Sequence, residues 1–154
     1  MGALTVWLVV ERVWACRLPT QQSAGKTLEP LVRLVGQDPR TKGLVQSFKN
    51  HQAAECGVGT PGVMVSAVAL LRDVPKPTIK QVQDALGGVL CRCTGYRKII
   101  DAVCEAGQAE FFPVAVSGSG AVGTSVARLD GLQKLQGREV FGDDVAPPQA
   151  LVIK

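Results

Sequence analysis

Two short cysteine-bearing loops restrict the fold and the chemistry of this chain more than any other feature. Residues 56–62 read C-G-V-G-T-P-G, and residues 91–96 read C-R-C-T-G-Y. A helical pattern follows each loop, so Cys56 and Cys93 each come just before the start of a helix. The unpaired N–H groups and the dipole at a helix N-terminus lower the pKa of a nearby thiol, and the thiolate is the form that binds metal. The pattern predicts a metal–thiolate site between the two helices.

Three of the four expected ligand positions of this site are cysteines, and the fourth is a glycine. Cys56, Cys91 and Cys93 are candidate metal ligands, whereas Gly59 stands in the second position of a C-x-x-C pair and has no side chain to donate. Soft, anionic sulfur suits iron in a cluster. Two alternatives stay open: the cysteines are buried residues of helix-capping loops without metal, or they hold zinc together with water or His51.

Composition narrows the class of protein. The 154 residues suit one domain with appendages or two small domains, and 46% apolar against 19% charged residues is the balance of a folded chain. The net charge of +4 comes from scattered basic residues, which argues against nucleic-acid binding. An odd count of five cysteines argues against a disulfide scaffold and for a reduced, cytoplasmic setting. The apolar residues 3–10 are too few to span a membrane and lack the preceding basic residues of a signal peptide.

The first part of the chain predicts a small β structure. Thr5–Val10 and Val13–Leu18 are rich in β-branched and aromatic residues and are expected to pair as a hairpin that turns at Glu11-Arg12. Residues 21–25 are expected to form a loop. Two strands alone are marginally stable, so this hairpin needs another surface to pack on.

The middle of the chain predicts helices, and residues typical of helix starts precede the first two. Asp38 is a good N-cap and Pro39 suits the first helical position. The second helix is expected to start at Thr60-Pro61 and to carry the apolar residues 63–71.

Two further helices are expected before residue 113. Thr78 with Gln81 forms a capping-box pattern, and the apolar stripe of that helix is Ile79, Val82 and Leu86. The last helix follows Thr94, with apolar residues at i, i+3, i+4 and i+7 over residues 96–103. Four short amphipathic helices joined by tight loops predict a small bundle.

The two cysteine loops resemble the iron–sulfur region of the molybdenum hydroxylases, which include xanthine dehydrogenase and aldehyde oxidoreductase. The second iron–sulfur domain of that family reads C-G-x-C-T-P-G and then C-R-C-T-G-Y. The resemblance implies a mainly α fold: a four-helix bundle that holds one [2Fe–2S] cluster beside the pterin, preceded by a β-hairpin remnant of a plant-type ferredoxin domain. It also implies that Cys56, Cys91 and Cys93 bind iron, and that Gly57, Arg92 and Gly95 lie beside the cluster.

The same resemblance divides the chain into four parts. Residues 1–30 are similar to the end of the ferredoxin domain, 31–112 to the helical domain, 113–127 form a linker, and 128–154 are similar to the start of the large molybdopterin-binding domain. Cys16 matches the last ligand of the ferredoxin domain, but Leu4 and Met1 stand where two other ligands are expected. The chain therefore looks like a segment of a longer enzyme, truncated at both ends.

The function implied is electron transfer from a molybdopterin centre through the [2Fe–2S] cluster. The expected partner is a molybdopterin-binding large subunit or domain, with neither nucleic acid nor membrane involved. As part of an oxidoreductase, the chain carries no complete active site of its own. Two departures from the family pattern are Gly59, in place of a cluster cysteine, and Glu55, where the family has a glutamine that approaches the pterin. Gly59 supports the alternative of a degenerate, metal-free bundle without redox activity.

Overall fold

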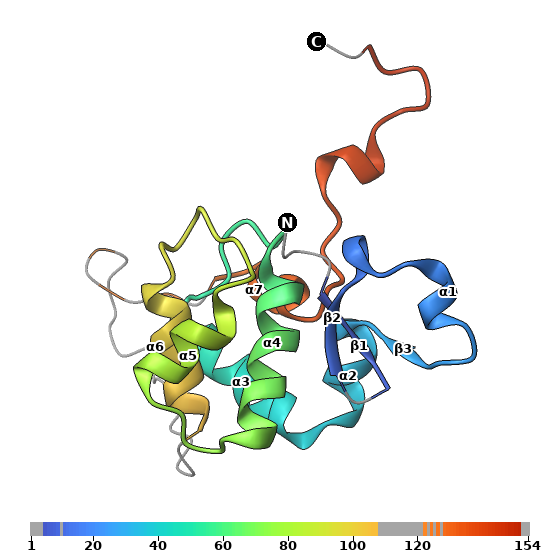
Figure 1. The fold of residues 1–154 in the computed structure, drawn as a ribbon. Helices are drawn as coiled ribbons and strands as arrows, with labels where there is room; N and C mark the ends of the chain where they lie inside the picture. Colours follow the sequence, from blue (N-terminus) through green and yellow to red (C-terminus); the bar gives the residue numbers. More distant parts are fainter. Residues whose placement is uncertain are drawn as a thin grey trace.

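A computed structural model describes residues 5–9, 11–107, 122, 124, 126 and 128–151 of the chain. The described part consists of helices that pack beside a small antiparallel sheet (Figure 1). The sheet has the strand order β2-β1-β3, with β1 at Thr5–Leu8, β2 at Glu11–Trp14 and β3 at Leu28–Glu29. The longer helices are α2 (Leu31–Gln37), α3 (Pro39–Asn50), α4 (Thr60–Asp73), α5 (Ile79–Leu86) and α6 (Arg97–Ala106). A short α1 (Thr20–Ser23) precedes them, and α7 (Gly131–Leu135) follows.

The predicted hairpin is present, but its turn lies earlier than expected. β1 and β2 pair antiparallel with Leu8 opposite Glu11, so the turn includes Val9 and the predicted turn at Glu11-Arg12 is wrong. Val9 has a φ of 60°, the left-handed conformation that such a tight connection requires. The second strand also ends earlier than predicted, because residues 15–17 form a short 3₁₀ helix.

The two tryptophans of the sheet pack on different parts of the helical region, Trp7 on α4 and Trp14 on the residues that follow α5. Trp7 on β1 is buried, and the guanidinium of Arg72 on α4 lies 4.8 Å from the centre of its ring. Trp14 on β2 lies over Gly88, where an added Cβ would come within 2.2 Å of the indole. The hairpin thus finds the packing surface that two strands alone lack.

The helix starts follow the local signals in the sequence. The side chain of Asp38 accepts a hydrogen bond from the N–H of Arg40 at 2.9 Å, at the start of α3. Thr78 and Gln81 form the complete capping box at the start of α5. α4 begins at Thr60 as expected. The last of the four, α6, begins at Arg97, since Tyr96 has a φ of 69° and ends the preceding loop.

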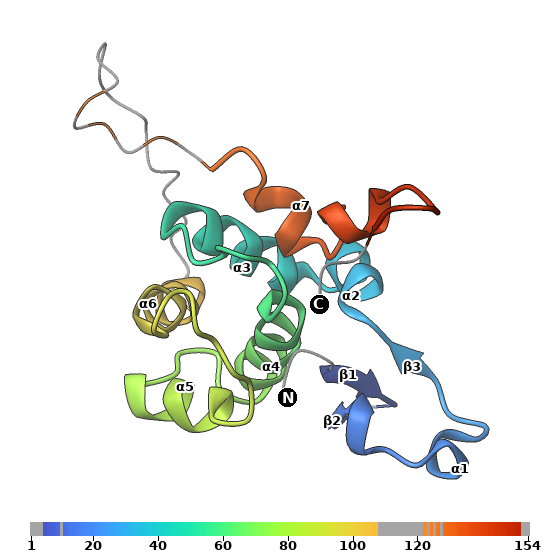
Figure 2. The ribbon, with the colours of Figure 1, turned by 90° about the horizontal axis from the view of Figure 1, so that it is seen from above.

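The core lies around α4, which is buried along most of its length. Helices α2, α3, α5 and α7 and strand β1 all pack against α4, and α6 packs against α3 and α5 (Figure 2). Val82 and Leu86 of α5 are buried as predicted, whereas Ile79 is 59% exposed and does not belong to the stripe. Ile79 directly follows the cap in the first turn of α5, where its side chain stays in solvent.

Three elements between residues 20 and 37 differ from the predictions. Helix α1 at Thr20–Ser23 overlaps the loop expected over residues 21–25, so that prediction is wrong for its first residues. β3 and α2 were not predicted, because no clear period is visible in this part of the sequence. Most of the predicted linker 113–127 lies outside the described residues, as do Met1 and Leu4. In the described residues, no helix is long and apolar enough to cross a membrane.

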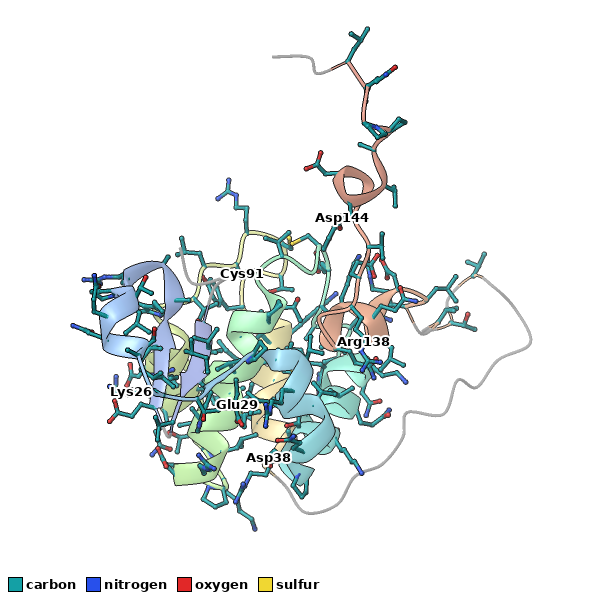
Figure 3. The ribbon with its side chains drawn as sticks, turned by 90° about the vertical axis from the view of Figure 1, so that its right-hand side faces the viewer. Lys26, Glu29, Asp38, Cys91, Arg138 and Asp144 are labelled. Carbon is teal, nitrogen blue, oxygen red and sulfur yellow. The ribbon has the colours of Figure 1, made fainter. Side chains whose placement is uncertain are left out.

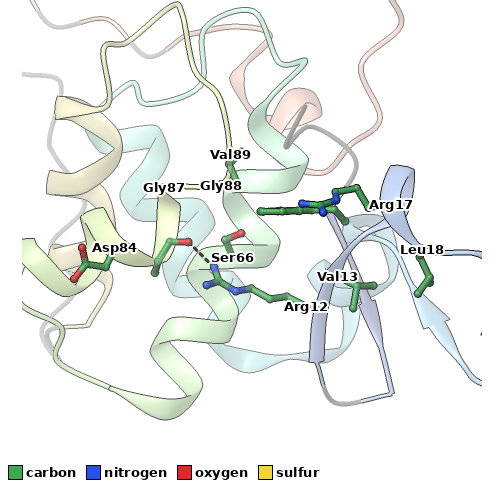
Figure 4. Close-up of a pocket in the computed structure, with 11 residues that line it drawn as sticks. Arg12, Val13, Arg17, Leu18, Ser66, Asp84, Gly87, Gly88 and Val89 are labelled. Atoms are coloured by element: carbon green, nitrogen blue, oxygen red, sulfur yellow. Dashed lines mark hydrogen bonds between the residues drawn. The ribbon is translucent and has the colours of Figure 1, made fainter. Parts of the chain in front are cut away.

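A large open cavity of about 650 Å³ lies between β2 and helices α4 and α5 (Figure 4). Its wall includes Arg12, Arg17, Ser66 and Asp84, and Arg12 donates a hydrogen bond across it to the carbonyl of Ala85. No cysteine lines this cavity, so the thiol chemistry of the chain lies elsewhere.

Candidate metal centre

The two cysteine loops face each other across a cavity of about 290 Å³. One loop connects α3 to α4 and the other connects α5 to α6, and Cys91 lies on the second loop (Figure 3). The cavity wall includes Cys56 and Gly59 from the first loop and Cys91 and Cys93 from the second. The fold therefore brings the three candidate ligands to one cavity.

The first loop places Cys56 just before α4. Gly57 has a φ of +87°, a conformation that a side chain makes costly, and it is buried. Partial burial raises the pKa of the Cys56 thiol, but hydrogen bonds from the backbone N–H of Val58, from the Cys93 thiol and from the N–H of Gly59 outweigh it, so the pKa is lowered. The loop thus favours the thiolate form of Cys56, as expected for a thiol beside a helix N-terminus.

Cys56 and Cys93 are in contact across the cavity. Cys93 donates a hydrogen bond to the Cys56 thiolate, and this bond raises the pKa of Cys93, to which the negative charges of Cys56 and Cys91 add. Two thiols joined by a hydrogen bond are close enough to bind one metal centre once both lose their protons. Metal binding at this pair therefore releases protons.

Tyr96 holds the second loop in shape. Its hydroxyl donates to the carbonyl of Val89 at 2.9 Å and accepts from the N–H of Cys91 at 2.8 Å. The hydroxyl of Thr94 accepts from the N–H of Tyr96 at 3.0 Å and lies 3.3 Å from the sulfur of Cys91. The sequence pattern places Tyr96 in an apolar stripe and gives no sign of these polar contacts.

Gly59 occupies the wall of the cavity without filling it. Its φ of −82° and ψ of −15° are ordinary helical values, so the backbone does not require glycine here. A Cβ at this position would meet the carbonyl oxygen of Leu90, on the opposite loop, at 3.0 Å. The donor set therefore fits a thiolate-bound cluster at three positions, and the fourth position lacks a side chain.

The candidate ligands of the cavity do not converge on one point. Within the described ranges, no three His, Cys, Asp or Glu side chains gather closely enough to hold one ion. A cluster is larger than an ion, so its ligands need not converge on one point. His51, the remaining nitrogen ligand of the zinc alternative, has its Nε2 atom 2.7 Å from the carboxylate of Glu105. His51 thus bonds Glu105 on α6 and does not line the cavity of the cysteine loops.

The other residues singled out in the sequence take different positions. Arg92 lines the cavity and is exposed, and Gly95 has a φ of +59° with open space around it. Cys16 is exposed on the 3₁₀ helix after β2. Cys104 on α6 is half-buried, and this burial raises the pKa of its thiol. Glu55 forms an ion pair at 3.8 Å with Lys98.

Part of the chain around this site is similar to known proteins. Residues 32–104 match the model of the [2Fe-2S] binding domain. The chain is 38% identical over 105 residues to the nicotine 6-hydroxylase small subunit of Paenarthrobacter nicotinovorans, covering 68% of this chain and 62% of that subunit. It is 40% identical over 88 residues to human aldehyde oxidase, covering 57% of this chain and 7% of that protein. The chain thus spans less than two thirds of the length of each.

Solved structures agree with these sequence matches. The aldehyde oxidoreductase from Desulfovibrio desulfuricans superposes with a TM-score of 0.78 at 30% identity, over 93% of this chain and 17% of that one. Quinoline 2-oxidoreductase from Pseudomonas putida 86 superposes with a TM-score of 0.62 at 32% identity, over 69% of this chain and 65% of the other. The likeness extends beyond the cysteine loops to most of the described fold.

Proposed function

Since the chain carries a [2Fe–2S] binding domain homologous to the small iron–sulfur subunit or domain of molybdenum hydroxylases such as aldehyde oxidase and xanthine dehydrogenase, we propose that it is an electron-transfer segment of such an enzyme. The observation that supports this most directly is the cavity shared by Cys56, Cys91 and Cys93. The thiolates of these residues hold the cluster. A [2Fe–2S] cluster supplies one-electron redox chemistry when it is bound.

The residues of both loops have separate tasks in this proposal. Backbone N–H groups of Val58 and Gly59 stabilise the Cys56 thiolate. Tyr96 fixes the backbone from Val89 to Cys91. Arg92 lines the cavity with a positive charge, which favours the anionic form of the site. The position beside Gly59 takes a ligand from outside the chain, such as water or a small thiol.

The arrangement of helices supports a finer description of the fold. Helices α3, α4, α5 and α6 pack in a ring, α3 on α4 and α6, and α5 on α4 and α6. We take this ring as the four-helix bundle of residues 31–112, with residues 1–30 as the remnant of a ferredoxin domain and 113–127 as a linker. Residues 128–154 then begin the large molybdopterin-binding part, which is the proposed electron donor and partner.

A metal-free bundle is the second candidate function, and Gly59 is the observation that favours it. The described core is closed around α4 by apolar residues and needs no metal to fill it. In that case the chain folds and keeps its loops but carries no electron.

Replacing Cys93 with serine tests the ligand assignment. We expect the Cys93→Ser variant to lose most of its bound iron and acid-labile sulfide, and to melt at a lower temperature, because cluster binding is coupled to folding. Cys16→Ser is the matched control, since Cys16 is exposed and does not line the cavity. Equal iron content and melting temperature in the Cys93→Ser variant and the unaltered chain would rule out Cys93 as a ligand.

A further inference from the structure

Lys134 on α7 is a charged side chain in an unusual place. It is 7% exposed, and it is the charged residue among the buried polar residues of the described chain. An ammonium group is costly to bury unless its hydrogen bonds are satisfied by charged or polar partners. The buried ammonium group of Lys134 therefore needs hydrogen-bond partners that offset its loss of hydration.

The ammonium group finds its partners in the first cysteine loop and in its own helix. Lys134 Nζ donates to the carbonyl oxygen of Glu55 at 2.9 Å, and it also bonds the carboxylate of Asp130 one turn earlier. Glu55 directly precedes Cys56 in the chain. A helix that follows the linker region thus holds the backbone of the loop that carries a candidate ligand.

The aliphatic stem of Lys134 makes a second contact with the same loop. A Cβ added at Gly57 would lie 2.8 Å from Cγ and 3.1 Å from Cδ of Lys134, distances too short for a side chain. Gly57 is therefore required both by its φ of +87° and by the close approach of this stem. The lysine covers the loop at the residues on either side of Cys56.

The base of the lysine is itself fixed to the domain. Leu135, the next residue of α7, is 1% exposed, and α7 packs against α3 and α4. Asp130 also forms an ion pair with Arg128, in which Nε of Arg128 lies 2.6 Å from Oδ1 of Asp130. Because α7 is anchored in the core, the hydrogen bond of Lys134 can transmit that position to the loop.

We propose that Lys134 is a positioning residue for the metal centre: it fixes the loop of residues 55–57 so that Cys56 faces the cavity. The site then includes a helix from the far side of the linker, in addition to the two cysteine loops. The link to a cluster rests on the proposed function, whereas the ordering of the loop does not depend on it.

Hydrogen exchange of the full chain without metal tests the ordering. In Lys134→Met, which keeps the stem and removes the ammonium group, we expect amides 55–59 to exchange at least tenfold faster, because a hydrogen bond from a charged group is lost. Lys80→Met is the matched control, since Lys80 also pairs with an aspartate one turn away but is exposed and does not line the cysteine cavity. Unchanged exchange at residues 55–59 in Lys134→Met would overturn the proposal.

Two further measurements keep the test decisive. If Lys134→Met opens the whole domain, seen as faster exchange along α4, Asp130→Asn is measured instead. A smaller increase at residues 55–59 is then expected, because the ammonium group loses its charged partner but keeps its bond to Glu55. In chains loaded with iron and sulfide, Lys134→Met is expected to lose iron to a chelator at least fivefold faster than Lys80→Met and to show a changed visible spectrum. If no variant takes up iron, the proposed function fails, while exchange at the loop still decides the role of Lys134.

Discussion

Replacing Tyr96 with phenylalanine removes one oxygen atom and, with it, both hydrogen bonds that shape the second cysteine loop. The hydroxyl bonds the carbonyl of Val89 and the N–H of Cys91 at 2.9 and 2.8 Å. Each such bond contributes about 1 kcal/mol net, and an unpaired buried group costs about 1–3 kcal/mol. Because this loop is half-buried, water can replace part of the loss, so we expect Tyr96→Phe to lower the free energy of unfolding by about 1–2 kcal/mol.

Two assays measure the effect of Tyr96→Phe, one on the stability of the whole chain and one on the order of the second cysteine loop. Urea unfolding followed by tryptophan fluorescence gives the change in stability, which corresponds to a lower melting temperature by about 2–8 °C for a chain of this size. The rate at which iodoacetamide labels Cys91 gives the order of the loop, and we expect it to rise in Tyr96→Phe. The matched control is Thr41→Val, which removes a buried hydroxyl bonded to the carbonyl of Leu34 at 3.3 Å. Thr41→Val is expected to lose stability without faster labelling of Cys91. Equal labelling rates in both variants would refute the role assigned to Tyr96.

Three other substitutions or conditions probe the same account. Gly57→Ala is expected to destabilise the chain more than Gly25→Ala in urea unfolding: both have positive φ, which costs about 1–2 kcal/mol, but open space surrounds Gly25 while Lys134 fills the space at Gly57. Equal losses would contradict that contact. Met64→Ala should cost about 2–5 kcal/mol, measured in the same way, because Met64 is fully buried. Hydrogen bonding from Lys134 lowers the pKa of Asp130 below its ordinary value of 3.8, so this carboxylate stabilises the fold above pH 3.8 and the contribution is lost as pH falls further. Asp130→Asn should remove that acid dependence, and hydrogen exchange of α7 measured against pH checks it.

Local signals in the sequence were enough to predict where the main helices start. Asp38 and the pair Thr78 and Gln81 cap helices by contacts within three residues, so their effect does not depend on the rest of the fold. The same local reasoning was wrong for Ile79, because burial is decided by which neighbour packs on a helix and not by its period alone. It also misplaced the turn of the hairpin, where Val9 adopts a left-handed conformation that β-branched residues rarely take.

The candidate site was predicted only as far as its cysteines. Cys56, Cys91 and Cys93 carry a recognisable spacing, and the structure brings them to one cavity. Lys134 has no such signal, because it reaches Glu55 from the far side of the predicted linker. Contacts between segments so far apart depend on the complete fold, and a pattern within one short segment does not contain them.

The proposed function requires that three thiolates and the fold around them suffice to hold a [2Fe–2S] cluster. The most direct test is anaerobic reconstitution with iron, sulfide and a small thiol, read by visible absorption and electron paramagnetic resonance, on the unaltered chain and on Gly59→Cys. The ordinary backbone conformation at Gly59 allows the cysteine, provided that the carbonyl of Leu90 moves slightly. We expect both chains to assemble the cluster and Gly59→Cys to hold it without the added thiol. A cluster in Gly59→Cys alone would contradict an electron-transfer role for this chain and leave the metal-free bundle.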